Sequence, residues 1–159
     1  PKSCKVIHRM GEETTLRIPS ATLKDLARIR RFIETSTADW PVQTDALYDL
    51  LLSVTELVTN TIVHGYRGKP GPVEVQVGRS GTALVVRLRD SAPPYDPNTA
   101  PIPDVTLPLE LRQPGGLGIY LCRHYLDSMQ HRSLPGQGNE LVLRKEGALT
   151  VEGNHVSDS

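Results

Sequence analysis

The sequence predicts an α+β domain, a two-layer sandwich in which helices cover one face of a mainly antiparallel, mixed sheet. Two observations lead to this fold class. The predicted elements follow one another as strand, helix, helix, two strands, a long loop, helix and two strands, an order that such a sheet accommodates. The 159 residues also suffice for one domain with a hydrophobic core. We expect a flexible lead-in at 1–13, the domain at 14–146 and a flexible tail at 147–159.

The first strand and helix are predicted for the start of this domain. Residues 14–18 alternate between polar and apolar side chains, as in a half-buried strand, and the strand is expected to stop at Pro19. Ser20 is a suitable N-cap residue, and apolar residues at helical spacing then predict a helix to about Thr37.

A second, longer helix is the centre of the predicted fold. It starts near Thr44 or Asp45 and ends at Gly65, because glycine is common just beyond a helix end. Its apolar residues recur at spacings of three and four, which is the period of a helix with one face in a core. They are Leu47, Leu50, Leu51, Val54, Leu57, Val58 and Ile62.

Three polar residues, Glu56, Asn60 and His64, follow this helix at intervals of four. Successive members are offset by about 40° around a helix of roughly 3.6 residues per turn, so they form one polar line. A carboxylate and a carboxamide one turn apart can serve one ligand, the first as a proton acceptor and the second as an oxygen ligand for Mg²⁺. The alternative is a solvated stripe on an amphipathic helix.

A β-hairpin and a long loop are predicted after the central helix. Residues 73–77 and 83–89 alternate as strands around a turn at 79–82. Asp90 follows directly, and its carboxylate can accept hydrogen bonds from an exocyclic amine and a ring N–H, or simply cap the turn. From 98 to 114 the chain is rich in proline and has no period, which is typical of a functional lid or a binding loop.

Glycines precede the third predicted helix. Gly115, Gly116 and Gly118 leave backbone N–H groups unobstructed at the positive end of the helix dipole, which suits an anion such as phosphate. The alternative is a hinge for the loop, without a ligand. The apolar spacing of this helix predicts that it reaches Met129. A final hairpin follows, with strands at 130–134 and 140–145.

Charge and cysteine content limit the classes of function. Eighteen basic and eighteen acidic side chains cancel, so no global attraction to nucleic acid or an anionic membrane is expected. Cys4 and Cys122 lack the spacing of a zinc site and are too few for a disulfide framework. No stretch approaches the roughly 18 apolar residues of a membrane span. We therefore expect a cytoplasmic protein that binds neither nucleic acid nor a membrane directly.

Three ordered motifs resemble those of a known superfamily. They are Glu56-x-x-x-Asn60-x-x-x-His64-Gly65-Tyr66, then Asp90-x-Ala92-Pro93-Pro94-Tyr95-Asp96-Pro97, then Gly115-Gly116-Leu117-Gly118-Ile119. They resemble the N, G1 and G2 boxes of the gyrase, chaperone, histidine-kinase and MutL (GHKL) ATPases, which have the Bergerat-type, histidine-kinase-like fold. The opening Leu16-Arg17-Ile18-Pro19 and the ending Asn139-Glu140-Leu141-Val142-Leu143-Arg144-Lys145 are similar to those of the anti-sigma-factor serine kinases of bacterial partner-switching systems.

This resemblance implies a role for each motif. Glu56 would be the general base that takes the proton of a substrate serine, and Asn60 would ligate Mg²⁺. Asp90 would bind the adenine amino group of ATP, with Ala92 beside it, and segment 98–114 would be the ATP lid. The backbone of Gly115, Gly116, Leu117 and Gly118 would hold the phosphates, with Arg112 as a further phosphate contact.

The resemblance also implies cofactors and partners. ATP and Mg²⁺ would be required. The substrate would be a serine on an anti-anti-sigma factor, and the unphosphorylated substrate would compete with a sigma factor for the kinase. Kinases of this kind are usually homodimers.

Two residues depart from the motifs. Ala92 stands where the second box usually has glycine, which adds a methyl group near the expected adenine pocket. Val142 stands where members commonly have a hydroxyl residue on the last strand. Both favour an alternative function, a module that sequesters a partner without kinase activity and is either gated by nucleotide or independent of it. Neither departure removes the base or the metal ligand.

Overall fold

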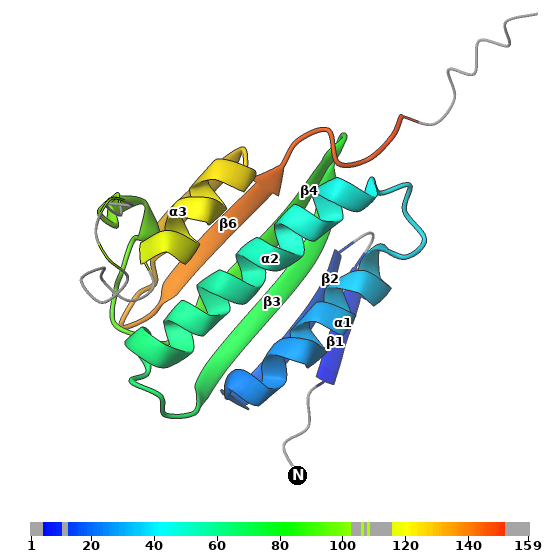
Figure 1. Ribbon diagram of the computed structural model, residues 1–159. Coiled ribbons are helices and arrows are strands. Elements are labelled where there is room, and N and C mark those ends of the chain that lie inside the picture. The colour runs from blue at the N-terminus through cyan, green and yellow to red at the C-terminus, as the bar shows by residue number, and fades with distance from the viewer. Residues whose placement is uncertain (1–4, 11–12, 103–105, 107, 109–115, 152–159) are drawn as a thin grey trace, which may run out of the picture.

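The described part of the chain forms a six-stranded sheet and three α-helices, and the helices lie on one face of the sheet (Figure 1). The computed structural model describes residues 5–10, 13–102, 106, 108 and 116–151. The strands are β1 (Lys5–Met10), β2 (Glu13–Ala21), β3 (Gly71–Ser80), β4 (Ala83–Asp90), β5 (Ser128–Ser133) and β6 (Asn139–Lys145). The two-layer α+β prediction is confirmed.

The strands lie in the order β1-β2-β3-β4-β6-β5. Each neighbouring pair is antiparallel, so the described strands contain no parallel pair of the kind that a mixed sheet would have. Because β4 lies beside β6, the end of β4 is next to the start of β6, where Asp90 pairs with Asn139. This pairing positions the site described below.

The helices are α1 (Leu26–Thr37), α2 (Thr44–Asn60) and α3 (Gly116–Tyr125). Short helical turns adjoin them: a 3₁₀ turn at Leu23–Asp25 precedes α1, and a π-helical turn at Thr61–Gly65 continues α2. A further 3₁₀ turn, Pro97–Thr99, lies in the loop after β4. Together α2 and its π turn run the whole predicted length of the central helix.

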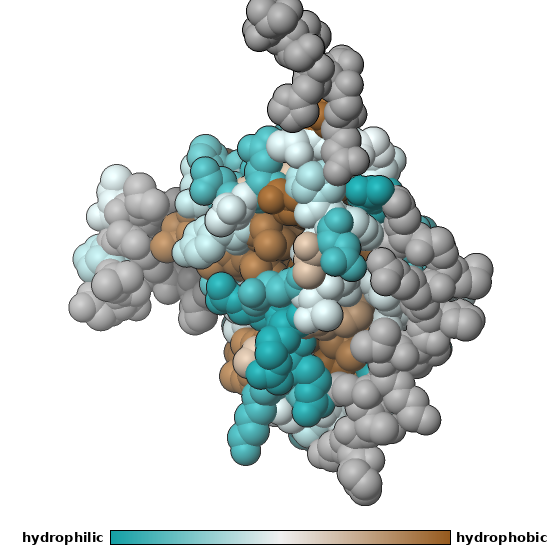
Figure 2. Space-filling view, turned by 90° about the vertical axis from the view of Figure 1, so that its right-hand side faces the viewer, coloured by the Kyte–Doolittle hydropathy of each residue, from teal (hydrophilic) through white to brown (hydrophobic). Residues whose placement is uncertain are grey.

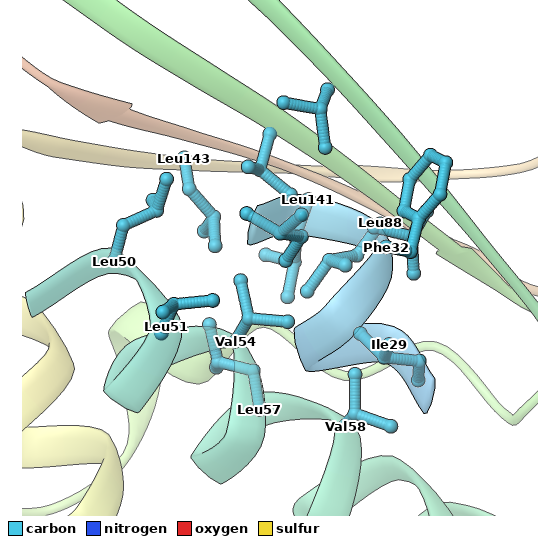
Figure 3. Packing of buried hydrophobic residues seen from close by; sticks show 14 of the residues in the cluster. Ile29, Phe32, Leu50, Leu51, Val54, Leu57, Val58, Leu88, Leu141 and Leu143 are labelled. Atoms are coloured by element: carbon cyan, nitrogen blue, oxygen red, sulfur yellow. The ribbon is translucent and has the colours of Figure 1, made fainter. Parts of the chain in front are cut away.

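The hydrophobic core lies between the helices and the sheet. In Figure 3, Leu50, Val54 and Leu57 of α2 point toward sheet residues such as Leu141 and Leu143, and all five side chains are buried. By length and composition alone, Thr44–Gly65 is apolar enough to cross a membrane. The burial of its apolar side chains against the sheet explains this hydropathy as that of a core helix.

The outer side of α1 is basic. Arg28, Arg30 and Arg31 are exposed there, and Arg30 pairs with Glu34 on the same helix at 3.3 Å. Figure 2 looks onto the side of the molecule that carries α1, where hydrophilic residues surround smaller hydrophobic areas. This surface is therefore dominated by solvated side chains.

The start of the first helical segment differs from the prediction. β2 continues through Pro19 and Ser20, and its register with β3 shifts across these two residues, an irregularity that tolerates a residue without N–H. Thr22, not Ser20, is the N-cap. Its backbone N–H donates to the Asp25 carboxylate at 2.8 Å, which completes a capping box.

The packed part of the molecule is larger than the predicted range of 14–146. Lys5–Met10, within the predicted lead-in, forms β1 at one edge of the sheet. Ala148 and Leu149, within the predicted tail, are buried. The Leu149 N–H donates to the Thr82 carbonyl at 2.9 Å, and the Ala148 carbonyl accepts from Gln43 N–H at 2.8 Å.

Two helix ends also differ from expectation. α3 ends at Tyr125, and Met129 lies in β5 instead. Gly65 ends the π turn at the predicted position, but its φ angle is not positive; after this turn the positive φ angles fall on Arg67 (54°) and Gly68 (77°). Gly65 is small for another reason, which concerns the site.

Candidate functional site

A cavity of about 370 Å³ opens at the C-terminal end of α2. It is lined by the end of α2 and its π turn, the loop after β4, the first turn of α3 and the start of β6. Polar lining residues include Asn60, His64, Asp90 and Asn139. Sites for small molecules typically measure about 300–1,000 Å³ and combine an apolar lining with a few polar groups, and this cavity has both properties.

The polar line predicted along α2 reaches the cavity only with its last two members, and the last of these, His64, lies in the π turn. The characteristic bond of this turn joins the Tyr66 N–H to the Thr61 carbonyl, five residues earlier, at 2.8 Å. Asn60 and His64 both line the cavity, whereas Glu56, one turn before Asn60, is not among the described lining residues. The structure thus brings Asn60 and His64 to the cavity and leaves Glu56 beside it.

Asp90 is held by three hydrogen bonds at the cavity wall. Its Oδ1 accepts from the Ala92 N–H and from the Asn139 side-chain amide, each at 2.9 Å. Its Oδ2 accepts from the Thr61 hydroxyl at 3.4 Å. Because both stronger bonds go to Oδ1, Oδ2 is the oxygen that has capacity for a donor in the cavity.

The environment raises the pKa of Asp90. Burial is the dominant cause, since it penalises the charged form, and hydrogen bonds from Asn139, Ala92 and Thr61 oppose it. A ligand amine that donated a hydrogen bond to the carboxylate would likewise offset the free-energy cost of burying its charge. Any group that donates a hydrogen bond to Oδ2 from the cavity would favour the charged form.

Asn139 is the residue that the sequence analysis missed. Its side-chain amide donates to Asp90 and to the carbonyls of Ala92 (3.3 Å) and Pro93 (3.1 Å). Its carbonyl oxygen accepts from the Tyr95 N–H at 2.8 Å and lies 2.7 Å from His131 Nε2. Buried at 5% exposure, Asn139 fixes the start of the loop after β4 at residues 92–95. The sequence signals were its polar side chain directly after the Gly136–Gly138 turn and its place at the start of the ending that resembles the anti-sigma-factor kinases.

Val142 does not leave a gap in the site. Residues of β6 alternate between the two faces of the sheet, and Leu141 and Leu143 point into the core. Val142 therefore lies on the opposite face from the cavity, paired with Arg87 and Gln130 of the neighbouring strands. The β6 residues that line the cavity are Asn139 and Leu141, so the departure at Val142 lies away from it.

Ala92 does not fill the cavity either. Its side chain is 3% exposed and packs against Gly65, where an added Cβ would lie 2.8 Å from the Ala92 Cβ. Real Cβ atoms do not approach so closely, so Gly65 provides the space that the Ala92 methyl group needs. The cavity stays open with alanine at this position.

Glu56 lies against the first turn of α3. A Cβ added to Gly118 would fall 2.1 Å from Glu56 Oε2 and 2.9 Å from its Cδ, so the carboxylate touches the backbone of this glycine. Gly116, two residues earlier, lines the cavity. The predicted base and the predicted phosphate-binding turn are therefore adjacent, joined through the start of α3.

The remaining predicted phosphate contacts are only partly described. Leu117 is 42% exposed, and neither it nor Gly118 is among the described residues that line the cavity. Gly115, Arg112 and most of the predicted lid at 98–114 lie outside the described residues. Gly116 is thus the member of the glycine motif that the structure places at the cavity.

The Asn60 carboxamide is a metal ligand of the kind that would suit Mg²⁺ bound together with phosphates. The described residues contain no cluster of three or more His, Cys, Asp or Glu side chains able to hold a metal alone. Mg²⁺ usually keeps several waters and takes one or two protein ligands along with substrate phosphates. The Asn60 carboxamide at the cavity meets that requirement.

Comparison with known proteins agrees with this geometry. Residues 19–145 match the family described as histidine kinase-like ATPase domain. The chain belongs to this family. The three boxes identified in the sequence lie within the matched range, and the fold of the ATPase-family domain is the one that the resemblance implied.

Several relatives of this ATPase-family domain are anti-sigma factors. An anti-sigma F factor from Clostridium kluyveri is 31% identical over 64% of this chain and 71% of its own length. Another from Thermoanaerobacter sp. is 29% identical over 72% of this chain and 82% of its own length. The serine/threonine-protein kinase BtrW of Bordetella bronchiseptica is 26% identical over 64% of this chain and 71% of its own length. The predicted resemblance to the anti-sigma-factor kinases is confirmed.

Proposed function

We propose that the protein is an ATP-dependent protein-serine kinase that phosphorylates an anti-anti-sigma factor and binds a sigma factor. One observation carries this proposal. The Glu56 carboxylate lies against Gly118 of α3. Gly116, two residues earlier in the same turn, lines the cavity together with Asn60 and Asp90. A proton acceptor, a metal ligand and an acceptor for an adenine amine are therefore grouped around one cavity.

The chemistry of phosphoryl transfer needs little beyond this set. Catalysis consists mainly of positioning and of stabilising charge on the phosphates. Glu56 accepts the proton of the serine hydroxyl as its oxygen attacks the γ-phosphorus of ATP, and ADP leaves. Asn60 would hold Mg²⁺, which would neutralise charge on the phosphates. Asp90 orients the adenine ring, and the N–H groups of the first turn of α3 bind the phosphates.

The relatives support the partners in this proposal. Their names as anti-sigma factors favour a sigma factor and an antagonist of the anti-anti-sigma class as partners. We further propose that the protein acts in the cytoplasm as a homodimer. These assignments rest on similarity, whereas the nucleotide site rests on the geometry.

The decisive experiment separates nucleotide binding from transfer. ATP is titrated calorimetrically into the purified protein with and without Mg²⁺, and transfer of labelled γ-phosphate is followed to a panel of purified anti-anti-sigma proteins. We expect Glu56→Ala to abolish transfer and to leave ATP affinity within about threefold, because removing a base affects the chemical step. Asn60→Ala and Asp90→Ala are expected to lose Mg²⁺-dependent ATP binding.

A matched control tests whether the loss is specific to Glu56. Glu34, an exposed acidic residue of α1 that pairs with Arg30, is changed to Ala and should affect neither measurement. Persistent transfer by Glu56→Ala would refute the role of the base. Absence of ATP binding to the unmodified protein, with sigma binding retained, would favour the nucleotide-independent sequestering module instead.

A further inference from the structure

The backbone conformation of Gly118 does not require a glycine. It is the third residue of α3 (Gly116–Tyr125). Several glycines adopt positive φ angles, but Gly118 is not one of them. Glycine weakens a helix relative to alanine because it loses more conformational freedom on folding. An explanation must therefore come from what surrounds the α-carbon.

The Glu56 carboxylate occupies the space where a side chain would be. An added Cβ at Gly118 would come within 2.1 Å of Oε2, 2.9 Å of Cδ and 3.4 Å of Cγ. The three nearest atoms to that position are thus all terminal atoms of one side chain. The missing side chain at 118 leaves the space that the Glu56 carboxylate occupies.

Packing of the two helices leaves α3 little freedom to move away. Cys122 of α3 is buried in the core, and its thiol donates to the Ser53 carbonyl of α2 at 3.6 Å. Gly118 and Cys122 are one turn apart on α3, and Ser53 and Glu56 are one turn apart on α2. A larger residue at 118 would therefore displace the carboxylate rather than the helix.

The contact also places the carboxylate in a favourable field. The first turn of a helix carries N–H groups without intrahelical partners and the positive end of the helix dipole, both of which stabilise a nearby anion. Glu56 touches α3 within this turn. Its negative charge is thereby held next to the residues that border the cavity.

We propose that Gly118 is a positioning residue for Glu56, and that it acts through the base and not as a phosphate contact. This role depends on the proposed kinase function only in its consequence for phosphoryl transfer. The contact itself is a property of the folded chain. Gly116 lines the cavity and Gly118 does not, so the two glycines of one motif have separate functions.

A thermodynamic cycle tests the contact without any assay of activity. Thermal unfolding is measured for Gly118→Ala in the native background and in a Glu56→Ala background. With Glu56 present, Gly118→Ala should change Tm less favourably than with Glu56 removed, because the added methyl group must displace the carboxylate. With Glu56 removed, the same change should raise Tm by about 2–4 °C, the gain expected from alanine in a helix. Equal effects in both backgrounds would overturn the proposal.

A kinetic comparison tests the consequence. Gly118→Ala should lower kcat for phosphoryl transfer roughly tenfold or more, because a misplaced base cannot reach the hydroxyl proton. The calorimetric Kd for Mg²⁺–ATP should change less than about threefold. A weakened Kd with kcat unchanged would identify Gly118 as a phosphate contact and refute the positioning role. If the unmodified protein transfers no phosphate, the kinase proposal fails, and the unfolding cycle still decides whether Gly118 positions Glu56.

Discussion

At the scale of single residues, Asn139 connects parts of the chain that the sequence keeps far apart. Its carboxamide satisfies Asp90, three backbone groups of the following loop and a ring nitrogen of His131. Asp90 would lose its strongest side-chain partner without it. A single side chain thus determines both the shape of the loop and the orientation of the carboxylate in the cavity.

Asn139→Ala should therefore damage stability and ligand binding together. We expect a loss of about 2–4 kcal/mol in the free energy of unfolding, since several buried polar groups lose their partner. Affinity for ATP should fall roughly tenfold, the equivalent of one hydrogen bond at Asp90. Urea unfolding and calorimetric titration measure the two effects. Gln130→Ala, an exposed residue of the adjacent strand β5, is the control, and an equal loss in that variant would contradict the explanation.

At the scale of elements, the end of α2 and the loop after β4 fit each other through a pair of small residues. Gly65 closes the π turn and Ala92 follows β4, and only one of the two positions has room for a methyl group. In the family that the sequence resembles, the position of Ala92 is usually a glycine. This chain has its methyl group on the loop, and the π turn carries the glycine that accommodates it.

The pair predicts a reciprocal rescue. Gly65→Ala should destabilise the protein by about 1–3 kcal/mol, because two Cβ atoms would overlap in a packed contact. Adding Ala92→Gly should recover most of that loss. Chemical unfolding of the two single variants and the double variant provides the measurement. If the double variant is no more stable than Gly65→Ala alone, the contact does not explain why residue 65 is glycine.

The elements differ in how far the sequence could predict them. The spacing of Leu50, Val54 and Leu57 predicted α2 because one helix face packs against one sheet, and periodicity records that directly. The N-cap at Thr22 was missed because a strand with a register shift can continue through Pro19. Met129 was assigned to α3 because a short apolar run suits a helix or a strand equally well.

The site was predictable only in part for a similar reason. Glu56, Asn60 and Asp90 belong to motifs that a sequence contains locally, and the structure brings Asn60 and Asp90 to one cavity. Asn139 reaches Asp90 only because β4 and β6 are neighbours in the sheet. Such a pairing depends on the whole topology, which no local pattern encodes.

At the scale of the whole molecule, the face of the sheet away from the helices carries a chain of ion pairs across five strands. Arg17 of β2 pairs with Glu74 of β3 at 2.9 Å, and Arg89 of β4 lies between Glu74 (3.8 Å) and Glu140 of β6 (2.8 Å). Arg132 of β5 pairs with Glu140 at 3.2 Å. These pairs connect neighbouring strands on a face that no helix covers.

Glu140 is the centre of this network, and its pKa predicts a pH dependence. Burial alone would raise the pKa, but hydrogen bonds and charges of Arg132 and Arg89 outweigh burial and lower it. The unfolded chain therefore binds the proton more readily than the native protein does. The stability that Glu140 contributes is fully present above the unfolded carboxyl pKa of about 4.3 and is lost as pH falls through the lowered native value.

Glu140→Gln should reproduce that loss at neutral pH. We expect a decrease of about 1–3 kcal/mol in the free energy of unfolding near pH 7, because the arginines lose a buried anion. The difference from the native protein should shrink as pH falls through the lowered native pKa, because the native carboxyl is then itself protonated. Urea unfolding across this range measures it, with Glu34→Gln as the surface control. A difference that does not change with pH would rule out the charge as its source.

The segment after β6 is joined to the far end of α2, and this placement matters for anyone who wants to attach something to the protein. The Gln43 N–H donates to the Ala148 carbonyl, and the Thr150 N–H donates to the Pro41 carbonyl, so residues 148–150 are bonded to the segment that leads into α2. The cavity lies at the opposite end of that helix, which with its π turn is roughly 30 Å long. A fluorophore or surface tether on the exposed Val151 would leave the cavity free. If the proposed ATP binding holds, immobilised and dissolved protein should therefore have the same affinity for ATP.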